Sequence, residues 1–286
     1  MAPAPGAGHD GGVISLRAGR LEAEVAPEAG MVVASLRRDG VELLGVRGGL
    51  DAYREHGSTF GVPLLYPFAN RLSDERCPLV DARAARRDEN GLPIHGLPVA
   101  RGPWRVEEAS AARVRGALDW DEAAFAPPHR VVVVHALDER GLTVTTRVEG
   151  EGVPVAFGWH PYLAVDRAAT EVEIPALRRH ALDGRGLPTG EVEEAPAFAG
   201  PLGDRTFDDL YEAPPGARFR AGAVTVVFGT GARWAQVFAP ASEPVIAFEP
   251  MTAPTNALVS GEGLERSPAE LRFRIAVARA PDRRPS

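Results

Sequence analysis

The stretch RVVVVHALDERGLTVTTRVEG, residues 130–150, is the clearest indication of the fold class of this chain. It is rich in valine and threonine, which is typical of β-strands, and a polar DERG sequence interrupts it as a turn would. Short runs of this kind recur along the chain between glycine and proline turn signals, whereas helical periodicity is scarce. The sequence therefore predicts an all-β protein, a large antiparallel β-sandwich or barrel with little helix.

Other segments support the same prediction. In residues 21–25, LEAEV, apolar and acidic residues alternate with the period of a half-buried strand. The pair Asp39-Gly40 is a strong hairpin signal. Residues 229–233, GTGAR, are interpreted as a turn between strands. Residues 79–91, LVDARAARRDENG, leave two alternatives open, a turn of helix or an irregular loop.

Composition excludes several classes of function. Of 286 residues, 44% are hydrophobic and 25% charged, which is ordinary for a globular protein. The net charge of −7 argues against a nucleic-acid partner, because phosphate recognition depends on basic surfaces. The chain contains no lysine, so neither a lysine Schiff base nor a phosphate-loop lysine is available. A single cysteine, Cys77, excludes an internal disulfide.

The pattern along the chain predicts one domain. Residues 1–12 are rich in glycine, alanine and proline and are expected to form a flexible leader, whereas residues 13–280 are expected to form a single β-sandwich domain. The N-terminus lacks the basic start and apolar run of a secretory signal. No stretch approaches the roughly 20 apolar residues that span a bilayer. We therefore expect a cytoplasmic protein without a membrane partner, either a monomer or a homodimer.

Two segments between strands carry candidate binding residues. In GVPLLYPFANRLSDE, prolines fix an extended path that ends at Asn70 and Arg71. In ENGLPIHGLPVARGPW, His95 is followed by Gly96, which allows close approach by another chain or a ligand. The structural alternatives are a surface arginine beside Asp74 and a loop histidine, and the segments alone leave both open.

A histidine and a glutamate stand out on two further segments. If residues 155–160, VAFGWH, form one strand, the small residues Ala156 and Gly158 share a face with His160, which favours a pocket over a packed core. In VIAFEP, Glu249 is expected at the end of an apolar strand, on the face opposite Phe248. The alternatives are a core histidine and a glutamate turned to solvent. If the two faces meet, the pair forms an acid–base couple whose acid is an imidazole, a group that titrates near neutrality. Glycosidases, by contrast, normally use two carboxylates.

The motifs PFANR, IHG, GWHPY and FEP, in this order and at these separations, resemble those of the aldose 1-epimerases, or galactose mutarotases. The resemblance extends from about residue 16 to residue 279. It implies a galactose mutarotase-like β-sandwich that uses no metal or organic cofactor. It also implies a small-molecule aldose as the binding partner and interconversion of its α and β anomers as the activity.

The resemblance assigns a role to each motif residue. Asn70 and Arg71 would bind sugar hydroxyls, and His95 would contact the sugar near its ring oxygen and C1. His160 would be the general acid and Glu249 the general base.

One further site residue follows from the family pattern of an aspartate three residues before an aromatic residue. Asp208 with Tyr211 has this spacing in TFDDLYE and would bind hydroxyls across the ring, and Asp209 is the competing choice. The segment EPMTAPTNAL lacks the acidic residue that often stands near Asn256 in the family. The identity of the sugar therefore remains open.

Three alternative functions are consistent with the sequence. A hexose-6-phosphate 1-epimerase would need further cations for the phosphate, and five arginines near the Arg71–His95 region are candidates: Arg54, Arg76, Arg83, Arg86 and Arg87. A sugar-binding module without catalytic activity would not need an acid–base pair. A lyase or hydrolase on a related sandwich would require a long groove for a polymer.

The remaining histidines give weaker signals. His129 and His135 bracket a valine run and are interpreted as strand-edge residues. His56 lies upstream of the Arg71 segment and is a weak candidate for the same pocket. No cluster of histidine, cysteine and acidic residues has the spacing of a metal site.

Overall fold

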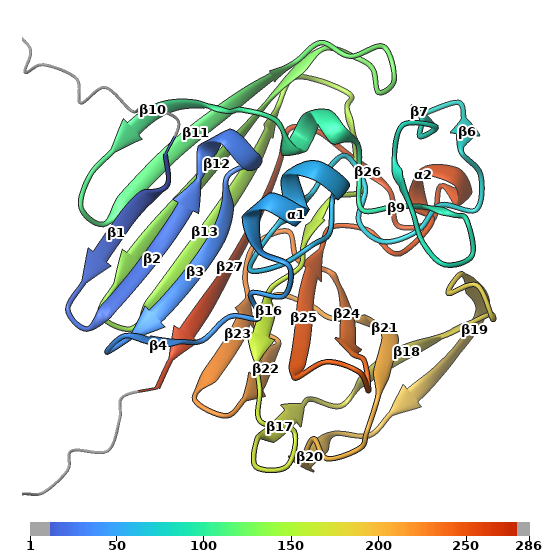
Figure 1. The fold of residues 1–286 in the computed structure, drawn as a ribbon. Helices are drawn as coiled ribbons and strands as arrows, with labels where there is room; N and C mark the ends of the chain where they lie inside the picture. The colour runs from blue at the N-terminus through green and yellow to red at the C-terminus, as the bar shows by residue number, and fades with distance from the viewer. Residues whose placement is uncertain (1–11, 279–286) are drawn as a thin grey trace, which may run out of the picture.

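The computed structural model describes residues 12–278 of the chain, and three antiparallel sheets contain most of its strands (Figure 1). The predicted leader, residues 1–12, lies almost wholly outside the described residues. The N-terminal sheet has four strands in sequence order: β1 (Ile14–Ala18), β2 (Leu21–Ala26), β3 (Val32–Arg38) and β4 (Val41–Glu42).

A nine-stranded sheet forms the back of the molecule in Figure 1. From one edge to the other its strands are β10 (Arg105–Ala109), β11 (Arg113–Trp120), β12 (His129–Asp138), β13 (Gly141–Glu149), β27 (Ala269–Val277), β23 (Val224–Phe228), β22 (Arg218–Ala221), β17 (Glu171–Ile174) and β20 (Phe198–Pro201). The stretch that indicated the fold class, residues 130–150, forms the central hairpin of β12 and β13.

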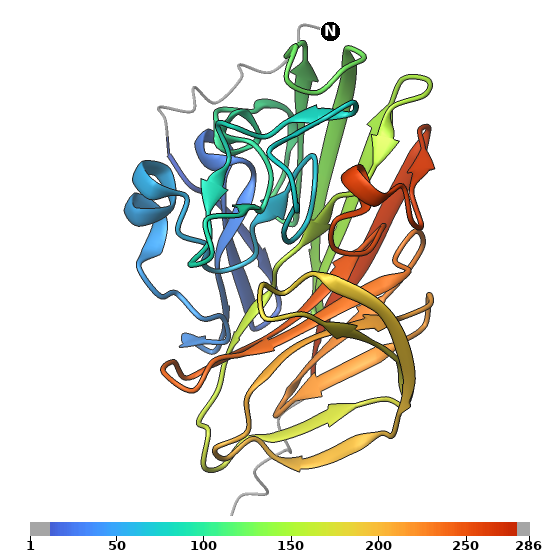
Figure 2. The same ribbon diagram turned by 90° about the vertical axis from the view of Figure 1, so that its right-hand side faces the viewer.

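An eight-stranded sheet lies in front of β22 and β23 (Figure 1). Its order is β19 (Pro188–Ala195), β18 (Leu177–Leu182), β21 (Phe207–Glu212), β24 (Trp234–Ala239), β25 (Val245–Met251), β15 (Gly158–Trp159) and β5 (Leu64–Leu65), with β16 (Tyr162–Ala164) paired to β25. In Figure 2 the hairpin of β18 and β19 faces the viewer.

Short elements complete the described chain. Three two-stranded ladders pair β6 (Arg76–Cys77) with β7 (Val80–Asp81), β8 (Arg86–Arg87) with β9 (Pro93–Ile94), and β14 (Pro154–Val155) with β26 (Glu265–Arg266). The helices are the 3₁₀ turns η1 (Pro27–Ala29) and η2 (Pro98–Arg101), and the α-helices α1 (Gly49–His56) and α2 (Ala257–Ser260). The prediction of an antiparallel β-sandwich with little helix is confirmed.

Large buried side chains join the layers. The Trp159 indole N–H, from β15, donates a 2.9 Å hydrogen bond to the Thr146 hydroxyl on β13. Phe248 on β25 stacks on Phe219 of β22, with ring centroids 5.3 Å apart. Apolar burial of this kind supplies the main stabilisation of such a sandwich. These contacts fix the eight-stranded sheet against the nine-stranded one, so that its other face is available for a site.

The turn predictions are confirmed where the structure describes them. Asp39 and Gly40 join β3 to β4 with φ angles of 52° and 79°, the left-handed pair that a two-residue hairpin requires. Residues 229–233 form a turn between β23 and β24. Of the two alternatives for residues 79–91, the structure has the irregular loop, interrupted by the short strands β7 and β8.

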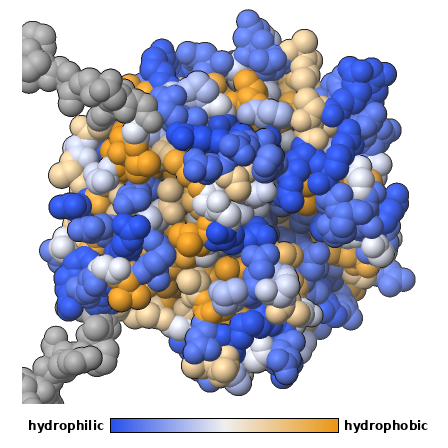
Figure 3. Space-filling model, viewed as in Figure 1, coloured by the Kyte–Doolittle hydropathy of each residue, from blue (hydrophilic) through white to orange (hydrophobic). Residues whose placement is uncertain are grey.

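The face of the molecule seen in Figure 3 is mostly hydrophilic. In Figure 3 hydrophobic residues appear in small separate groups, and hydrophilic residues predominate on the right-hand side, where β18 and β19 lie. Within residues 12–278, no helix is long and apolar enough to cross a membrane.

The interpretation of His129 and His135 as strand-edge residues was wrong. Both lie on β12, which is flanked by β11 and β13, and both side chains are buried. The His135 Nε2 atom is 2.9 Å from the Met31 carbonyl, which ties the N-terminal sheet to the central hairpin. This hydrogen bond satisfies one of the two ring nitrogens on the buried face, whereas Nδ1 has no partner within residues 12–278.

His135→Gln is expected to weaken the dependence of stability on pH. Burial lowers the pKa of His135 from 6.5 to about 4, so the stability associated with the neutral ring is lost as the pH falls from 6.5 towards 4. One such group contributes about 2–3 kcal/mol over this range. Glutamine does not titrate and can still donate to the Met31 carbonyl. The drop in unfolding free energy between pH 7 and 4.5 should therefore be about 2 kcal/mol smaller than in the wild type, as measured by urea titration.

His56 provides the matched control for this experiment. Its side chain is 72% exposed and carries no buried hydrogen bond, so His56→Gln should leave the pH dependence as in the wild type. An identical change in both variants would contradict the role given to His135.

Candidate active site

The structure brings all six predicted site residues to one cavity of about 420 Å³ on the free face of the eight-stranded sheet. They come from segments far apart in the sequence: Asn70, Arg71 and His95 from the loops after β5 and β9, His160 from between β15 and β16, Asp208 from β21, and Glu249 from β25. By contrast, His56 is exposed on α1 and does not line this cavity.

His160 and Glu249 are in direct contact. The His160 Nε2 atom lies 3.1 Å from the Glu249 Oε1 atom, and the two side chains are only 4% and 2% exposed. Burial, with a smaller contribution from His95 and Arg47, lowers the pKa of His160 well below 6.5. Burial and the nearby Asp208 raise the pKa of Glu249 well above 4.5. Both pKa shifts have burial as their main cause, because a side chain withdrawn from water is less stable in its charged form.

The local path of the chain around His160 differs from the single strand expected for residues 155–160. Two short strands, β14 and β15, replace it, and His160 lies in the break between β15 and β16. Pro161 has no backbone N–H for a ladder bond, and the His160 N–H donates instead to the Pro63 carbonyl at 3.1 Å. The expected outcome for the side chains still holds, since Trp159 points into the core and His160 lines the cavity.

Glu249 lies inside β25 and not at its end, which corrects the expected strand boundary. Alternation along β25 places Phe248 in the core and Glu249 on the cavity side, as expected. The neighbouring strand β24 sets Gln236 directly opposite Glu249. The Gln236 amide donates a 2.6 Å hydrogen bond to Asp208 Oδ1, so the three polar residues form a row across β25, β24 and β21.

The same register separates Asp208 from Asp209. Asp208 lines the cavity with Gln236, whereas the carboxylate of Asp209 lies 3.3 Å from the guanidinium of Arg179 and does not line it. Adjacent residues on a strand point to opposite faces. Of the two alternatives, only Asp208 is therefore placed to contact a ligand in this cavity.

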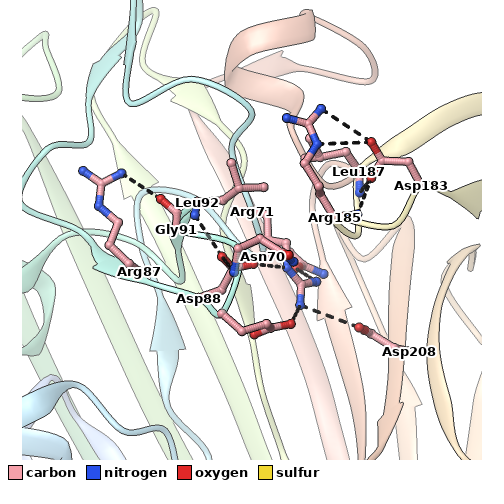
Figure 4. A network of polar contacts seen from close by, with 12 residues as sticks. Asn70, Arg71, Arg87, Asp88, Gly91, Leu92, Asp183, Arg185, Leu187 and Asp208 are labelled. Carbon is pink, nitrogen blue, oxygen red and sulfur yellow. Dashed lines mark hydrogen bonds and ion pairs between the residues drawn. The ribbon is translucent and has the colours of Figure 1, made fainter.

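Arg71 is the centre of a charged network (Figure 4). Its Nε donates to Asp88 at 2.7 Å, its Nη1 donates to Asn70 at 3.2 Å, and its Nη2 lies 3.7 Å from Asp208. Asp88 in turn accepts the backbone N–H of Leu92 at 2.8 Å. The Arg71 side chain is only 9% exposed, and these partners leave its guanidinium one orientation, with donors towards the cavity.

Strained backbone holds the two loop residues in place. Asn70 and His95 have φ angles of 56° and 62°, and the His95 N–H donates a 3.0 Å hydrogen bond to the Asn70 carbonyl. Such angles are uncommon outside glycine and concentrate at functional sites. Gly96 is required next to them, because a Cβ there would lie 2.1 Å from the Tyr66 carbonyl oxygen. The expectation that this glycine allows close approach of another chain segment is confirmed.

Sequence reasoning missed the residues that surround His160. Tyr162 stacks on the imidazole with ring centroids 3.9 Å apart. Its hydroxyl lies 2.7 Å from the Thr59 hydroxyl and 3.0 Å from Arg47 Nη1, and Arg47 is itself paired with Glu243. The Nδ1 atom of His160 has no hydrogen-bond partner within residues 12–278. Ring stacking, and not a second hydrogen bond, therefore fixes the orientation of this histidine.

Several buried polar atoms at the cavity have no partner in the part of the chain that the structure describes. They are His95 Nδ1, His160 Nδ1, Gln236 Oε1 and Glu249 Oε2. Buried polar atoms without partners are rare in folded proteins and call for an explanation such as a bound polar group. Donors and acceptors mixed in this way suit a ligand rich in hydroxyls. Among the described residues, no group of three or more histidine, cysteine or acidic side chains is placed to hold a metal ion.

A sequence comparison decides the family. The family model described as aldose 1-epimerase matches residues 12–227. The chain belongs to the aldose 1-epimerase family. A search of curated proteins finds no match.

Several solved structures share this fold. A Synechocystis protein is 20% identical, with a TM-score of 0.73 over 97% of this chain and 100% of that one. A galactose mutarotase-like protein from Lactobacillus casei is 17% identical, with a TM-score of 0.73 over 93% and 100%. A GalM/aldose epimerase homologue from C. elegans is 14% identical, with a TM-score of 0.75 over 93% and 98%. At these identities the comparison establishes the fold, and the chemistry has to be argued from the site.

Proposed function

We propose that this member of the aldose 1-epimerase family interconverts the α and β anomers of a free hexose by opening and closing the sugar ring. The observation that carries the proposal is the buried contact between His160 and Glu249 in a cavity lined largely by polar side chains. A site that only binds sugar does not need an acid–base pair that is withdrawn from water. The group in direct contact with Glu249 is an imidazole, whereas a glycosidase normally uses a pair of carboxylates.

The proposed mechanism moves one proton at each end of the bond that breaks. Glu249 accepts the proton of the hydroxyl on C1, and His160 donates a proton to the ring oxygen as the bond between that oxygen and C1 breaks. Rotation about the C1–C2 bond turns the aldehyde, and the reverse transfers close the ring on its other face. Arg71, Asp208 and His95 hold the sugar hydroxyls, so that positioning and proton transfer supply the acceleration.

The number of protons held by His160 and Glu249 together is consistent with this mechanism. Burial lowers the pKa of His160 and raises that of Glu249, which favours a neutral imidazole beside a protonated carboxyl. This form holds one proton between the two groups, as many as the imidazolium and carboxylate that begin ring opening. Since the two groups touch, the proton can redistribute within the pair without exchange with solvent.

Polarimetry tests the proposal directly. The protein should accelerate the change in optical rotation of freshly dissolved α-glucose or α-galactose above the buffer rate. Binding of these sugars without acceleration would favour a catalytically silent sugar-binding module instead.

One observation favours a second candidate, a hexose-6-phosphate 1-epimerase. Of the five arginines considered for a phosphate site, only Arg86 and Arg87 line the cavity. Arg87 is paired with Glu75 at 2.7 Å, whereas exposed Arg86 has no ion-pair partner within residues 12–278. An unpaired guanidinium at the rim of a sugar site is suited to an anionic substituent.

Arg86→Gln distinguishes the two candidates. If the natural substrate is phosphorylated, the variant should raise KM for glucose 6-phosphate by about tenfold, since a charge-assisted contact contributes about 1.5 kcal/mol or more. Glucose should be turned over at the wild-type rate. Equal KM values for glucose 6-phosphate in the variant and the wild type would exclude a phosphate role for Arg86. Rates are compared by polarimetry on both sugars.

A further inference from the structure

Tyr162 contacts two groups at once, the imidazole of His160 and the guanidinium of Arg47. The two aromatic rings are stacked with centroids 3.9 Å apart, and the Arg47 Cζ atom lies 4.8 Å from the centre of the Tyr162 ring. Burial raises the pKa of the Tyr162 hydroxyl, so the phenol stays neutral well into the alkaline range. The charge that acts on His160 from this side is therefore that of Arg47.

Four hydrogen bonds fix the Arg47 guanidinium. Its Nε and Nη2 atoms donate to the two carboxylate oxygens of Glu243 at 2.6 and 2.7 Å, which makes a bidentate ion pair. Its Nη1 atom donates to the Thr59 carbonyl at 2.8 Å and to the Tyr162 hydroxyl at 3.0 Å. Arg47 also has a left-handed φ of 40°, a strained conformation that persists only where the surroundings hold it. The cation therefore keeps one place at the wall of the cavity.

The other ionisable groups that face His160 act on it differently. Glu249 on β25 is its proton partner, 3.1 Å away. The ring of His95 lies 5.4 Å away between centroids, and burial lowers the pKa of His95 to about 3, so this ring is neutral near pH 7. Arg86 on β8 is exposed and has no ion-pair partner within residues 12–278, so nothing in that part of the chain fixes its charge near the imidazole. Arg47 is the cation whose position is fixed, and its side chain is only 27% exposed.

A fixed charge beside the His160–Glu249 pair changes the pH at which the pair gains or loses a proton. Positive charge disfavours every added proton, and Arg47 contributes, after burial and His95, to the lowered pKa of His160. The carboxylate of Glu243 acts in the opposite direction. Under the proposed mechanism the active form of the pair holds one proton, so these two charges influence the pH range in which that form exists.

We propose that Arg47 is a positioning residue, which holds Tyr162 against His160 and, balanced by Glu243, sets the pH range in which the pair transfers protons. The inference rests on the proposed function and goes beyond it by naming a residue that acts on the reacting pair through a neighbour. If the ion pair served structure alone, loss of either partner would have the same consequence, the loss of one clamp on Tyr162. If its charges matter, the two losses have opposite consequences.

Arg47→Gln and Glu243→Gln test this difference. Activity falls when the pair gains a second proton or loses its only one, so kcat/KM for glucose should have an acidic and an alkaline midpoint. In Arg47→Gln the remaining carboxylate favours protonation, and both midpoints should rise by about one pH unit. In Glu243→Gln the remaining guanidinium disfavours protonation, and both should fall by a similar amount. Polarimetric rates over a series of pH values, corrected for the buffer rate at each pH, give the midpoints.

Three further variants keep the result interpretable. The double variant with Arg47→Gln and Glu243→Gln removes both charges, so its midpoints should return to within about half a pH unit of the wild type. Arg47→Lys retains the positive charge and should do the same. Arg147→Gln breaks an ion pair of the same kind, with Glu270 at 2.7 Å, that does not line the cavity, and should leave the profile unchanged.

The outcomes separate failure of this inference from failure of the proposed function. Shifts of the two single variants in the same direction, or no shift in either, overturn the role of Arg47 alone. A raised KM for glucose in Arg47→Gln with unmoved midpoints also overturns it and assigns Arg47 to sugar binding. If Arg47→Gln does not fold, the direction of the shift in Glu243→Gln decides. A wild type that accelerates the anomerisation of no sugar overturns the proposed function, and this inference with it.

Discussion

Glu249→Gln is expected to lower kcat/KM for anomerisation of glucose by about 10²–10⁴-fold, the range of a general base in proton transfer. Glutamine has nearly the same shape and fits between Gln236 and His160, but it cannot accept the proton of the C1 hydroxyl. The sugar contacts of Arg71 and Asp208 remain, so KM should change little and the loss should fall on kcat. Polarimetric progress curves at several sugar concentrations separate the two constants.

Stability measurements and a second variant control this experiment. Burial raises the pKa of Glu249, so the wild type loses stability as the pH rises from 4.5 through the folded-state value, and Glu249→Gln should lack that loss. Glu270→Gln makes the same chemical change on β27, which does not line the cavity, and should keep the wild-type rate. A Glu249→Gln variant that is folded and as fast as the wild type would exclude Glu249 as the base.

The sequence predicted the site well where a side chain's position follows from alternation in an unbroken strand. Glu249 and Phe248 face opposite sides of β25, as their alternation indicated. The apolar run of residues 154–164 was less predictable, because Pro161 and the change of pairing partner from β26 to β25 and β5 divide it into three strands. The path of this run is decided by tertiary pairing, which no local pattern contains.

Residues that depend on pairing between strands escaped prediction. Gln236 belongs to the site because the register of β24 sets it opposite Glu249. Tyr162 reaches His160 because β16 pairs with β25, the strand that carries Glu249. For the same reason the choice between Asp208 and Asp209 stayed open until the register of β21 with β24 was known. Register is fixed by the whole buried face, so contacts between strands become visible only in three dimensions.

The ion-pair partners of the charged side chains also could not be predicted from the sequence. Five arginines near the Arg71 segment looked equivalent, yet only Arg86 and Arg87 of these line the cavity. Arg87 is paired with Glu75, whereas Arg86 has no ion-pair partner among residues 12–278. A second histidine–glutamate pair, His180 with Glu212 at 3.0 Å, has a geometry similar to that of His160 and Glu249. It lies outside the cavity that holds His160 and Glu249, and its glutamate is 34% exposed.

His160→Gln is expected to lower kcat/KM for glucose by about 10²–10⁴-fold and to change the shape of the pH profile. In the wild type, the active form of the His160–Glu249 pair holds one proton. Activity should fall in acid, below the lowered pKa of His160, when both groups are protonated. It should also fall in alkali, above the raised pKa of Glu249, when neither is. The profile is therefore bell-shaped, and its limbs belong to the pair.

Each single variant should replace the bell-shaped profile with a rate that changes in one direction with pH. In His160→Gln the residual rate depends on the carboxylate of Glu249 alone, so it should rise with pH where the wild-type rate falls. In Glu249→Gln it depends on protonated His160, so it should rise as the pH decreases. His180→Gln removes a similarly placed imidazole outside the cavity and should preserve the bell shape on glucose. A His160→Gln profile that keeps the alkaline fall would assign that limb to another group and exclude His160 as the acid, because only loss of the shared proton reverses the dependence.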